Sequence, residues 1–397
     1  MGTSEDTFQR ALTAADIDAA NGLTRHWLAA RAEIPSAASG LGIWPLLAVL
    51  ATGAVEDTRD ELLAAARIDA DRAAAVPAAL LAALRESPAL SAAVAVWAGK
   101  RVTLDPDWTA GLPVDAVGSL TGDPAADKAA LDDWASRNTR GLIPEMPLDF
   151  GQPIDLVLAS ALAVKTTWRT PFTDLRRTFR TGPWAGLGQV RGLTAVLGDV
   201  LRVADDASVL TVAGDGDIDV LLALGRDGLD PHAVVDTLLD AADPAWGRSA
   251  TELTPGERAI GVEVAEYRSM RPQAGPETAV DTVRFRLDAD LDLSADAAAL
   301  GLVLASDQDR ARFDRLAAEP VYVSQAKQAC TAVFSATGFE AAAVTAMAMA
   351  RAAGVPKFDH THVQARIVFD RPFAYLARHR PTGLVLVAGW VAEPETA

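Results

Sequence analysis

The sequence predicts an α+β fold in which helices come first and strands dominate the remainder. Apolar residues recur at three- and four-residue spacing over residues 8–32 and 56–66, as is typical of helices. From Leu90 onward the chain turns to β-branched and alternating runs, which predict strands. Helical patterns at residues 128–138 and 231–242 interrupt the strands without the regular alternation of a parallel βαβ fold. The mixture indicates the α+β class.

The later elements follow from the same patterns. The expected strands, in chain order, are residues 92–97, 154–164, 201–212, 218–224, 282–287, 321–323, 330–334, 363–369 and 384–391. A further short helix is expected at 295–300, and the Pro- and Gly-richer segments 182–192 and 271–276 are expected to be turns. Because no internal repeat or low-complexity linker divides the chain, we expect a single domain over residues 1–397.

Composition narrows the possible partners. The chain has 397 residues, with 53 acidic against 36 basic side chains and a net charge of -17, so most of its surface repels polyanions and nucleic acid is not expected as a ligand. No run of about 18 apolar residues is free of charge, so no membrane segment is expected. The first ten residues lack the order of a signal peptide. The compartment stays open between the cytoplasm and a mature secreted form.

Metal and disulfide chemistry are not expected. Cys330 is the only cysteine, which excludes an intrachain disulfide and predicts a small buried side chain in a strand. His360 and His362 would share one face of a strand and could hold a metal weakly, but without further ligands a solvated loop is favoured. Asp215 and Asp217 alternate as in a calcium loop, yet Arg226 stands where its final glutamate belongs. We therefore expect no metal and no cofactor, and a hairpin turn at Asp215.

One short motif suggests an enzyme. Ser324 and Lys327 form the S-x-x-K pattern of penicillin-recognising enzymes, which requires the serine at the start of a helix. Here the serine follows residues 321–323, which predict a strand. No other catalytic motif is present, so we expect that the protein is not an enzyme.

A run of small residues near the C-terminus is the most informative segment. Residues 336–346 (ATGFEAAAVTA) carry a glycine, a phenylalanine and one acidic residue, followed by small side chains with no further charge until Arg351. Small residues at alternate positions fit between two neighbouring strands without overpacking. The run could be a loop in one state and a strand in another.

This run and several other motifs, in order along the chain, resemble the serpin family. The segments are 39–43 (SGLGI), 50–54 (LATGA), 57–62 (DTRDEL), 134–143 (WASRNTRGLI), 156–161 (LVLASA), 165–172 (KTTWRTPF), 369–373 (FDRPF), 378–379, 382–383 and 389–391 (GWV). Because the motifs keep the family's order over nearly the whole chain, the sequence is identified as a serpin of apparently prokaryotic type.

The resemblance implies a fold and a function. Serpins pack helices around a large main sheet and two smaller sheets, and expose a reactive-centre loop, here about residues 337–366. A target protease cleaves the loop, which then inserts into the main sheet and traps the protease as an acyl-enzyme. The expected protein is thus a monomeric suicide inhibitor of serine or cysteine proteases, with the target protease as covalent partner.

The resemblance also assigns roles to residues. The expected hinge comprises Gly338, Phe339, Glu340, Ala341, Ala342, Ala343, Val344 and Thr345, and the expected scissile region comprises Ala350, Arg351, Ala352 and Ala353. The region where the sheet opens is expected to contain Ser39, Ser160, Trp168 and Gln328.

Departures from the family pattern keep an alternative open. Phe339 stands where inhibitory members carry a small residue, and Ala336 replaces an acidic one. Gly42, Ser160 and Gln328 stand at positions of a serine, an asparagine and a histidine, so the polar latch of the sheet is either loosened or rebuilt. A non-inhibitory serpin that acts as a binding or carrier protein, or a surface loop that inserts into nothing, fits these departures.

Overall fold

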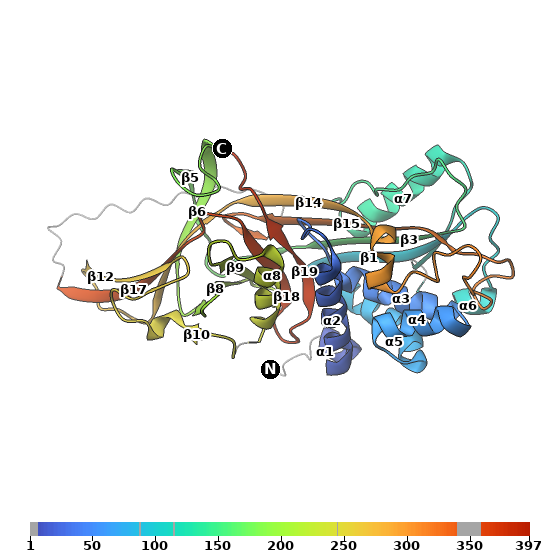
Figure 1. The fold of residues 1–397 in the computed structure, drawn as a ribbon, viewed down its shortest axis with the longest axis horizontal. Helices are drawn as coiled ribbons and strands as arrows, with labels where there is room; N and C mark the ends of the chain where they lie inside the picture. Colours follow the sequence, from blue (N-terminus) through green and yellow to red (C-terminus); the bar gives the residue numbers. More distant parts are fainter. Residues whose placement is uncertain (1–6, 87–88, 114–115, 244, 340–358) are drawn as a thin grey trace. The chain divides into compact units, whose positions relative to one another are not determined.

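The computed structural model describes residues 7–86, 89–113, 116–243, 245–339 and 359–397 (Figure 1). The chain groups into two compact units. Unit 1 contains residues 1–165, 288–332 and 378–388, and unit 2 contains residues 166–287, 333–377 and 389–397. Among the described residues, no helix is long and apolar enough to cross a membrane.

Most of the helices belong to unit 1. They are α1 (Thr7–Ala11), α2 (Ala14–Ala30), α3 (Gly40–Gly53), α4 (Glu56–Ala66), α5 (Ala70–Glu86), α6 (Pro106–Ala110), α7 (Pro124–Asn138) and α9 (Ala297–Leu300), the last preceded by the 3₁₀ turn Leu293–Asp296. Local chemistry explains several boundaries, because Thr13 and Asp16 form a capping box at α2 while Asp123 caps α7 ahead of Pro124. Helix α3 is apolar on nearly all sides and buried, and so lacks amphipathic periodicity.

Unit 1 is built on strands β1 (Leu90–Ala98), β2 (Val117–Ser119), β3 (Leu156–Val164) and most of β15 (Val323–Phe334), in the order β2-β1-β3-β15. Strands β1 and β3 are buried along nearly their whole length, whereas β2 is partly exposed. Strand β3 is antiparallel to β1 and parallel to β15. Side chains alternate between the faces, so Ala159 and Ala161 of β3 point away from the face that Ser160 occupies.

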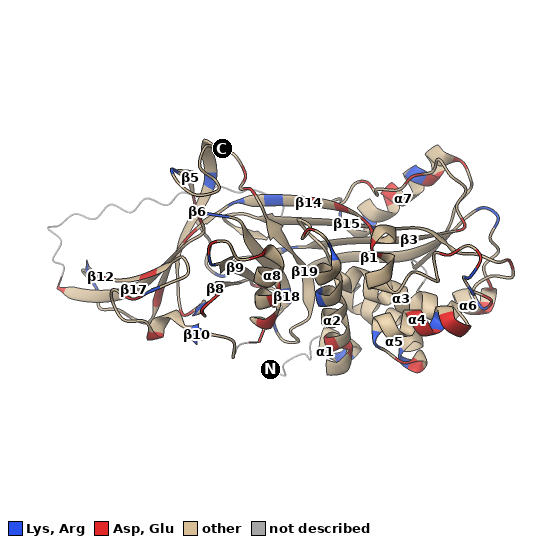
Figure 2. Cartoon of the chain, viewed as in Figure 1, with Lys and Arg blue, Asp and Glu red and all other residues tan. Residues whose placement is uncertain are grey.

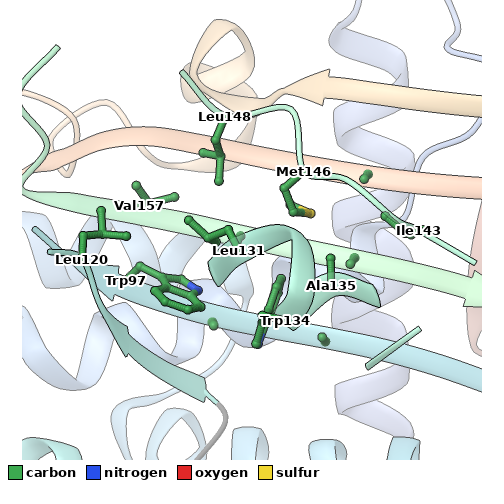
Figure 3. Packing of buried hydrophobic residues seen from close by; sticks show 14 residues of the cluster. Trp97, Leu120, Leu131, Trp134, Ala135, Ile143, Met146, Leu148 and Val157 are labelled. Atoms are coloured by element: carbon green, nitrogen blue, oxygen red, sulfur yellow. The ribbon is translucent and has the colours of Figure 1, made fainter. Parts of the chain in front are cut away.

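Helix α7 covers one face of these strands (Figure 3). Trp97 of β1 and Trp134 of α7 meet edge to face, with ring centroids 6.3 Å apart and planes at 87°. The rest of the cluster comprises Ala93, Ala95, Leu120, Leu131, Ala135, Ile143, Met146, Leu148, Val157, Ala159, Ala161 and Ala329. Helices α3 and α5 contact β1 as well. The strands are therefore enclosed in apolar side chains, and any movement of them disturbs packed surface.

Unit 2 is dominated by strands. They are β4 (Thr166–Thr167), β5 (Thr173–Thr178), β6 (Gln189–Leu197), β7 (Leu201–Val203), β8 (Ala207–Ala213), β9 (Ile218–Gly225), β10 (Arg248–Ser249), β11 (Arg258–Ala259), β12 (Val262–Ser269), β13 (Glu277–Val283), β16 (Gly338–Phe339) and β17 (His360–Val368). Strands β14 (Phe285–Asp292), β18 (Phe373–His379) and β19 (Val385–Val391) contribute residues to both units. Helix α8 (Pro231–Asp240) and the 3₁₀ turn Ala250–Glu252 complete unit 2.

Three sheets and the helices confirm the predicted α+β class. The two further sheets have the orders β10-β7-β8-β9-β18-β19 and β11-β12-β17-β13-β6-β5. Some predicted boundaries are wrong. The run 201–212 is two strands, because the chain reverses where the Ala204 amide bonds the Ala207 carbonyl, and the end of the predicted turn 182–192 is the start of β6. The turn at Asp215, between β8 and β9, is confirmed.

A buried carboxylate joins three strands of unit 2. Acidic side chains lie on helices and strands throughout the chain (Figure 2), but Asp281 of β13 is nearly buried. It accepts hydrogen bonds from Arg177 of β5 (2.6 Å) and from Nε of Arg366 of β17 (2.8 Å). Burial acts to raise the pKa of Asp281, but the hydrogen bond from Arg366 and the charge of Arg177 outweigh it and hold that pKa below the ordinary value of 3.8.

Replacing Asp281 tests this ion pair. Asp281→Asn is expected to lower the free energy of unfolding by about 2–3 kcal/mol at pH 7, less than the ~3–5 kcal/mol of a fully buried pair because Arg366 is largely exposed. A depressed pKa stabilises the fold above the unfolded-state value and loses that effect as the pH falls through the folded-state value. The difference between variant and wild type, followed by urea denaturation, should therefore shrink as the pH falls below the unfolded-state pKa and vanish only below the depressed folded-state pKa of Asp281.

The control is Asp206→Asn, which removes a pair with Arg226 whose side chains are both more than half exposed. This pair is expected to contribute less than about 0.5 kcal/mol. Equal losses for the two variants would contradict a stabilising role of the buried carboxylate.

Candidate functional site

Three of the residues expected to control sheet opening meet at the start of α3. Gln328 of β15 and Ser160 of β3 are register partners on neighbouring strands. Ser39 is the N-cap of α3, and its hydroxyl accepts a hydrogen bond from the Gly42 amide (3.2 Å) and donates one to the Leu386 carbonyl (2.6 Å). The side chains of Gln328 and Ser160 face this cap, so strand and helix meet through polar groups in a buried position.

Gln328 joins the strand to the helix with both atoms of its amide. Its Oε1 accepts from the Ser39 N–H at 2.9 Å, and its Nε2 donates to the Ser39 carbonyl at 2.8 Å. Nε2 also lies 3.4 Å from the Ser160 hydroxyl. Ser39, Ser160 and Gln328 are each at most 1% exposed. Separating β15 from α3 would leave these groups without partners in a buried place, which is costly.

Gly42 is required by this arrangement. A Cβ atom at position 42 would lie 2.3 Å from the Ser160 hydroxyl and 2.8 Å from Nε2 of Gln328. The missing side chain thus makes the room that the glutamine amide uses. Of the two alternatives that the sequence left open, the geometry agrees with a rebuilt polar cluster.

Cys330 follows two residues later on β15. It is buried, as predicted, and its sulfur lies 3.3 Å from Oε1 of Gln328. Burial, together with the negative charge of Asp290, raises the pKa of the Cys330 thiol far above its ordinary value. The thiol is therefore not a nucleophile at neutral pH.

The first two hinge residues, in unit 2, form a strand. In β16, Phe339 pairs antiparallel with Phe334 at the end of β15, and on the other side Gly338 and Phe339 pair with β4. A Cβ atom on Gly338 would lie 2.2 Å from the Thr166 carbonyl oxygen. Glycine is therefore needed here because of the close approach of backbone, and not because of a positive φ angle.

Phe339 is fully buried among aromatic rings. Its ring centroid lies 6.5 Å from that of Trp168 and 6.2 Å from that of Tyr375. Trp168 in turn contacts Phe334 at 4.8 Å and donates its indole N–H to the Ser335 carbonyl at 2.8 Å. Forcing an aromatic side chain into a packed sheet would cost about 1–3 kcal/mol. This cost does not arise for Phe339, because its ring lies in a site formed by Trp168 and Tyr375.

The remaining expected loop residues are only partly described. Glu340, Ala341, Ala342, Ala343, Val344, Thr345, Ala350, Arg351, Ala352 and Ala353 lie outside the described residues. The downstream limit of the expected loop moves from residue 366 to residue 359, because His360–Val368 form strand β17.

The histidine pair lies in that strand and not in a solvated loop. His362 is 6% exposed, with Nδ1 2.9 Å from Oε1 of Glu277 and Nε2 2.7 Å from the Arg271 carbonyl oxygen. The sequence prediction is wrong because β17 is paired with β12, and because Tyr267 and Glu277 lie against the His362 ring, which the local pattern does not indicate. In the described part of the chain, no group of three or more His, Cys, Asp or Glu is placed to hold a metal ion.

The S-x-x-K residues point to separate partners. Ser324 accepts a hydrogen bond from the Asp155 amide at 2.9 Å, and Lys327 forms an ion pair with Asp292 at 3.0 Å. Both residues lie in a strand, so the serine is not at a helix start and the two side chains do not form a nucleophile and base pair.

Comparison with known proteins agrees with this geometry. Residues 20–181 and 257–394 match the family model described as Serpin (serine protease inhibitor). The chain belongs to the serpin family.

Two curated relatives illustrate the similarity. The chain is 26% identical to plasminogen activator inhibitor 1 of Sus scrofa over 277 residues, which cover 66% of this chain and 61% of that protein. It is 26% identical to the putative serpin-Z6C of Oryza sativa subsp. japonica over 413 residues, covering 94% and 95% of the two chains. The match to plasminogen activator inhibitor 1 thus spans about three fifths of that relative.

Solved serpin structures share the fold. Native protease nexin-1, crystallised with heparin, superposes with a TM-score of 0.72 at 20% identity, covering 96% of this serpin and 99% of that chain. Tengpin, a thermophilic serpin in its native state, gives a TM-score of 0.72 at 16% identity, covering 99% and 95%. The likeness confirms the serpin fold that the sequence predicts.

The buried amide is tested by Gln328→Leu, which keeps the side-chain length but leaves the Ser39 N–H and carbonyl unpaired. The variant is expected to lower the free energy of the first unfolding transition in urea by about 2–4 kcal/mol. Gln325→Leu is the control, because Gln325 also bonds both backbone groups of one residue, Asp149, but at the surface. It should cost less than about 1 kcal/mol, since water replaces those bonds. Similar costs for both would contradict the importance of burial.

The burial of Phe339 is tested by Phe339→Ala. Because a two-residue strand can leave the sheet instead of enclosing a cavity, the loss is expected to be limited to the burial energy of the ring, about 1.5–3 kcal/mol. Hydrogen exchange of the peptide around residues 335–339 should speed up while exchange in α2 stays unchanged. Phe179→Ala, which removes a partly exposed ring beside Trp184, is the control and should leave exchange at β16 as in wild type.

Proposed function

We propose that this serpin is a suicide inhibitor of serine or cysteine proteases that is cleaved in its reactive-centre loop and traps the protease by loop insertion. The observation that carries the proposal is strand β16. Gly338 and Phe339 are already paired between the end of β15 and β4, so the first residues of the loop occupy the place that an inserted strand would extend.

The register of β16 supports the expected length of insertion. Phe339 faces Phe334 in an antiparallel pair, so each later residue of the loop would face one residue earlier on β15. Continued as far as Gln325, where the pairing of β15 becomes irregular, this register sets Ala348 opposite Gln325. Only Val323 and Ser324 of β15 remain beyond that point. The expected scissile region, Ala350 to Ala353, thus begins where the partner strand ends, and a loop cut there is long enough to pair along all of β15.

The proposed chemistry uses the protease's own catalytic groups. Its serine or cysteine attacks a carbonyl carbon in the scissile region, the peptide bond breaks, and the new amino end leaves while the upstream segment stays attached as an acyl-enzyme. Insertion of that segment displaces and distorts the protease before water hydrolyses the ester or thioester. The serpin contributes no catalytic residue. Arg351 suits a trypsin-like protease, whereas Ala350 or Ala352 suits an elastase-like one.

The described residues fit a sheet that resists opening until a strand enters. The Gln328 amide holds β15 to the cap of α3, and the Phe339 ring holds the start of the loop. The family model that matches this chain is described as a serine protease inhibitor, which supports a protease as the target here.

The deciding experiment combines adduct formation with thermal stability. A panel of trypsin-, chymotrypsin-, elastase- and subtilisin-like proteases is expected to yield, with at least one member, an SDS-resistant complex whose cleavage site maps to residues 350–353 by mass spectrometry. Protein nicked there without adduct should melt well above intact protein, because insertion completes the sheet. Clean nicking with no adduct and no rise in melting temperature would favour the alternative, a non-inhibitory serpin that binds or carries another molecule.

A further inference from the structure

Strand β17 receives the chain directly after the loop and is paired on both sides. Antiparallel strand β12 pairs with it from Ser269↔His360 to Val262↔Ile367, and parallel strand β13 pairs with it from Glu277↔Gln364 to Asp281↔Val368. The short strand β11 pairs with β12 and completes a hairpin. Because β17 is an interior strand, its release breaks two ladders of hydrogen bonds, where an edge strand would break one.

A glutamine extends the ladder beyond the start of β13. Nε2 of Gln273 donates to the Val363 carbonyl at 2.8 Å, and the Val363 N–H donates to Oε1 of Gln273 at 3.0 Å. These bonds replace the strand neighbour that Val363 lacks on the side of β13, whose first pair is Glu277↔Gln364. The turn between β12 and β13 is thereby joined to the beginning of β17.

Side-chain hydrogen bonds also hold the first residues of β17. His362 binds Glu277 through Nδ1 and the Arg271 carbonyl through Nε2, at 2.9 and 2.7 Å. The Tyr267 hydroxyl of β12 donates to Oε2 of Glu277 at 2.5 Å and lies 3.1 Å from Nδ1 of His362. Residues from β12, the turn, β13 and β17 thus form one connected group around the first residues of β17.

An intact loop is held at both ends. Residues 340–350 laid along β15 would form a strand about 36 Å long, at ~3.3 Å per residue. The nine residues 351–359 reach at most about 32 Å, so they cannot run back along that whole strand. Full insertion of an uncut loop therefore pulls on β17, while cleavage removes that pull.

We propose that the β11–β12 hairpin and the 270–277 turn form a lock that keeps β17 in its sheet and so prevents the intact loop from inserting. The inference rests on the proposed function, because it concerns the regulation of the same loop. The lock acts only on the intact loop, whereas the proposed inhibition follows cleavage of the loop. Its removal should change the lifetime of the intact inhibitor and leave the cleaved form unaffected.

The test uses the full chain with Gln273→Ala and Tyr267→Phe combined, both mild changes at the surface. Asn21→Ala is the control, because it also removes a carboxamide that bonds backbone groups, the Gly383 carbonyl and the Val385 N–H, and it lies on neither β15 nor β17. Intact proteins are incubated at a temperature below the melting transition, and aliquots are assayed for the fraction still cleavable in the loop. The lock variant is expected to lose cleavable loop at least tenfold faster than wild type and the control, with at least tenfold faster hydrogen exchange of the Val363 amide.

Each other outcome has a separate meaning. If the lock variant keeps its cleavable loop as long as wild type, while nicked wild type gains thermal stability, the lock is wrong and the proposed function stands. If the lock variant loses cleavable loop faster but the nicked variant gains less stability than nicked wild type, the lock also fails, because the change then affects insertion itself. If nicked wild type gains no stability, the proposed function fails and the lock fails with it.

Discussion

The hydrogen-bonded pair between the Gln328 side chain and the Ser39 backbone is the interaction on which the arrangement of unit 1 depends. It joins the central strand β15 to the cap of the buried helix α3. The identities of the surrounding residues follow from it. Gly42 must lack a side chain because the amide and the Ser160 hydroxyl occupy that space, and Ser160 must be small and polar because it is the register partner of Gln328.

The same device recurs elsewhere in the chain. Gln325 bonds both backbone groups of Asp149, and Gln273 bonds those of Val363, so each of these three glutamines pairs with the N–H and the carbonyl of one residue. A carboxamide suits this task because it carries one donor and one acceptor side by side and does not titrate. Because the protein has a net charge of -17, hydrogen bonds from uncharged carboxamides do not add to the repulsion among its carboxylates. The Asp281 carboxylate, in contrast, requires two arginines.

The two ends of the loop are held by different chemistry. Upstream, the Phe339 side chain is held by apolar burial against Trp168 and Tyr375. Because apolar burial does not depend on direction, it would allow further residues to join strand β16. Downstream, β17 is anchored by two ladders of hydrogen bonds and by a polar cluster around His362. The contacts of Phe339 would allow β16 to lengthen, whereas the hydrogen bonds of β17 resist its release. This difference suits the proposed loop, which would move only after it is cut.

The sequence by itself determined the α+β class and the serpin family, because these depend on patterns that are local or keep a fixed order along the chain. It also singled out Gly338, Phe339, Ser160 and Gln328. It misjudged His362, because the residues around that ring are far away along the chain, namely Tyr267 of β12, Arg271 in the turn and Glu277 of β13. It left the fit of Phe339 and the state of the polar cluster open, since both depend on which distant side chains surround them. Only the tertiary structure decided that Tyr375 and Trp168 shape a site for the ring and that Gly42 makes room for Gln328.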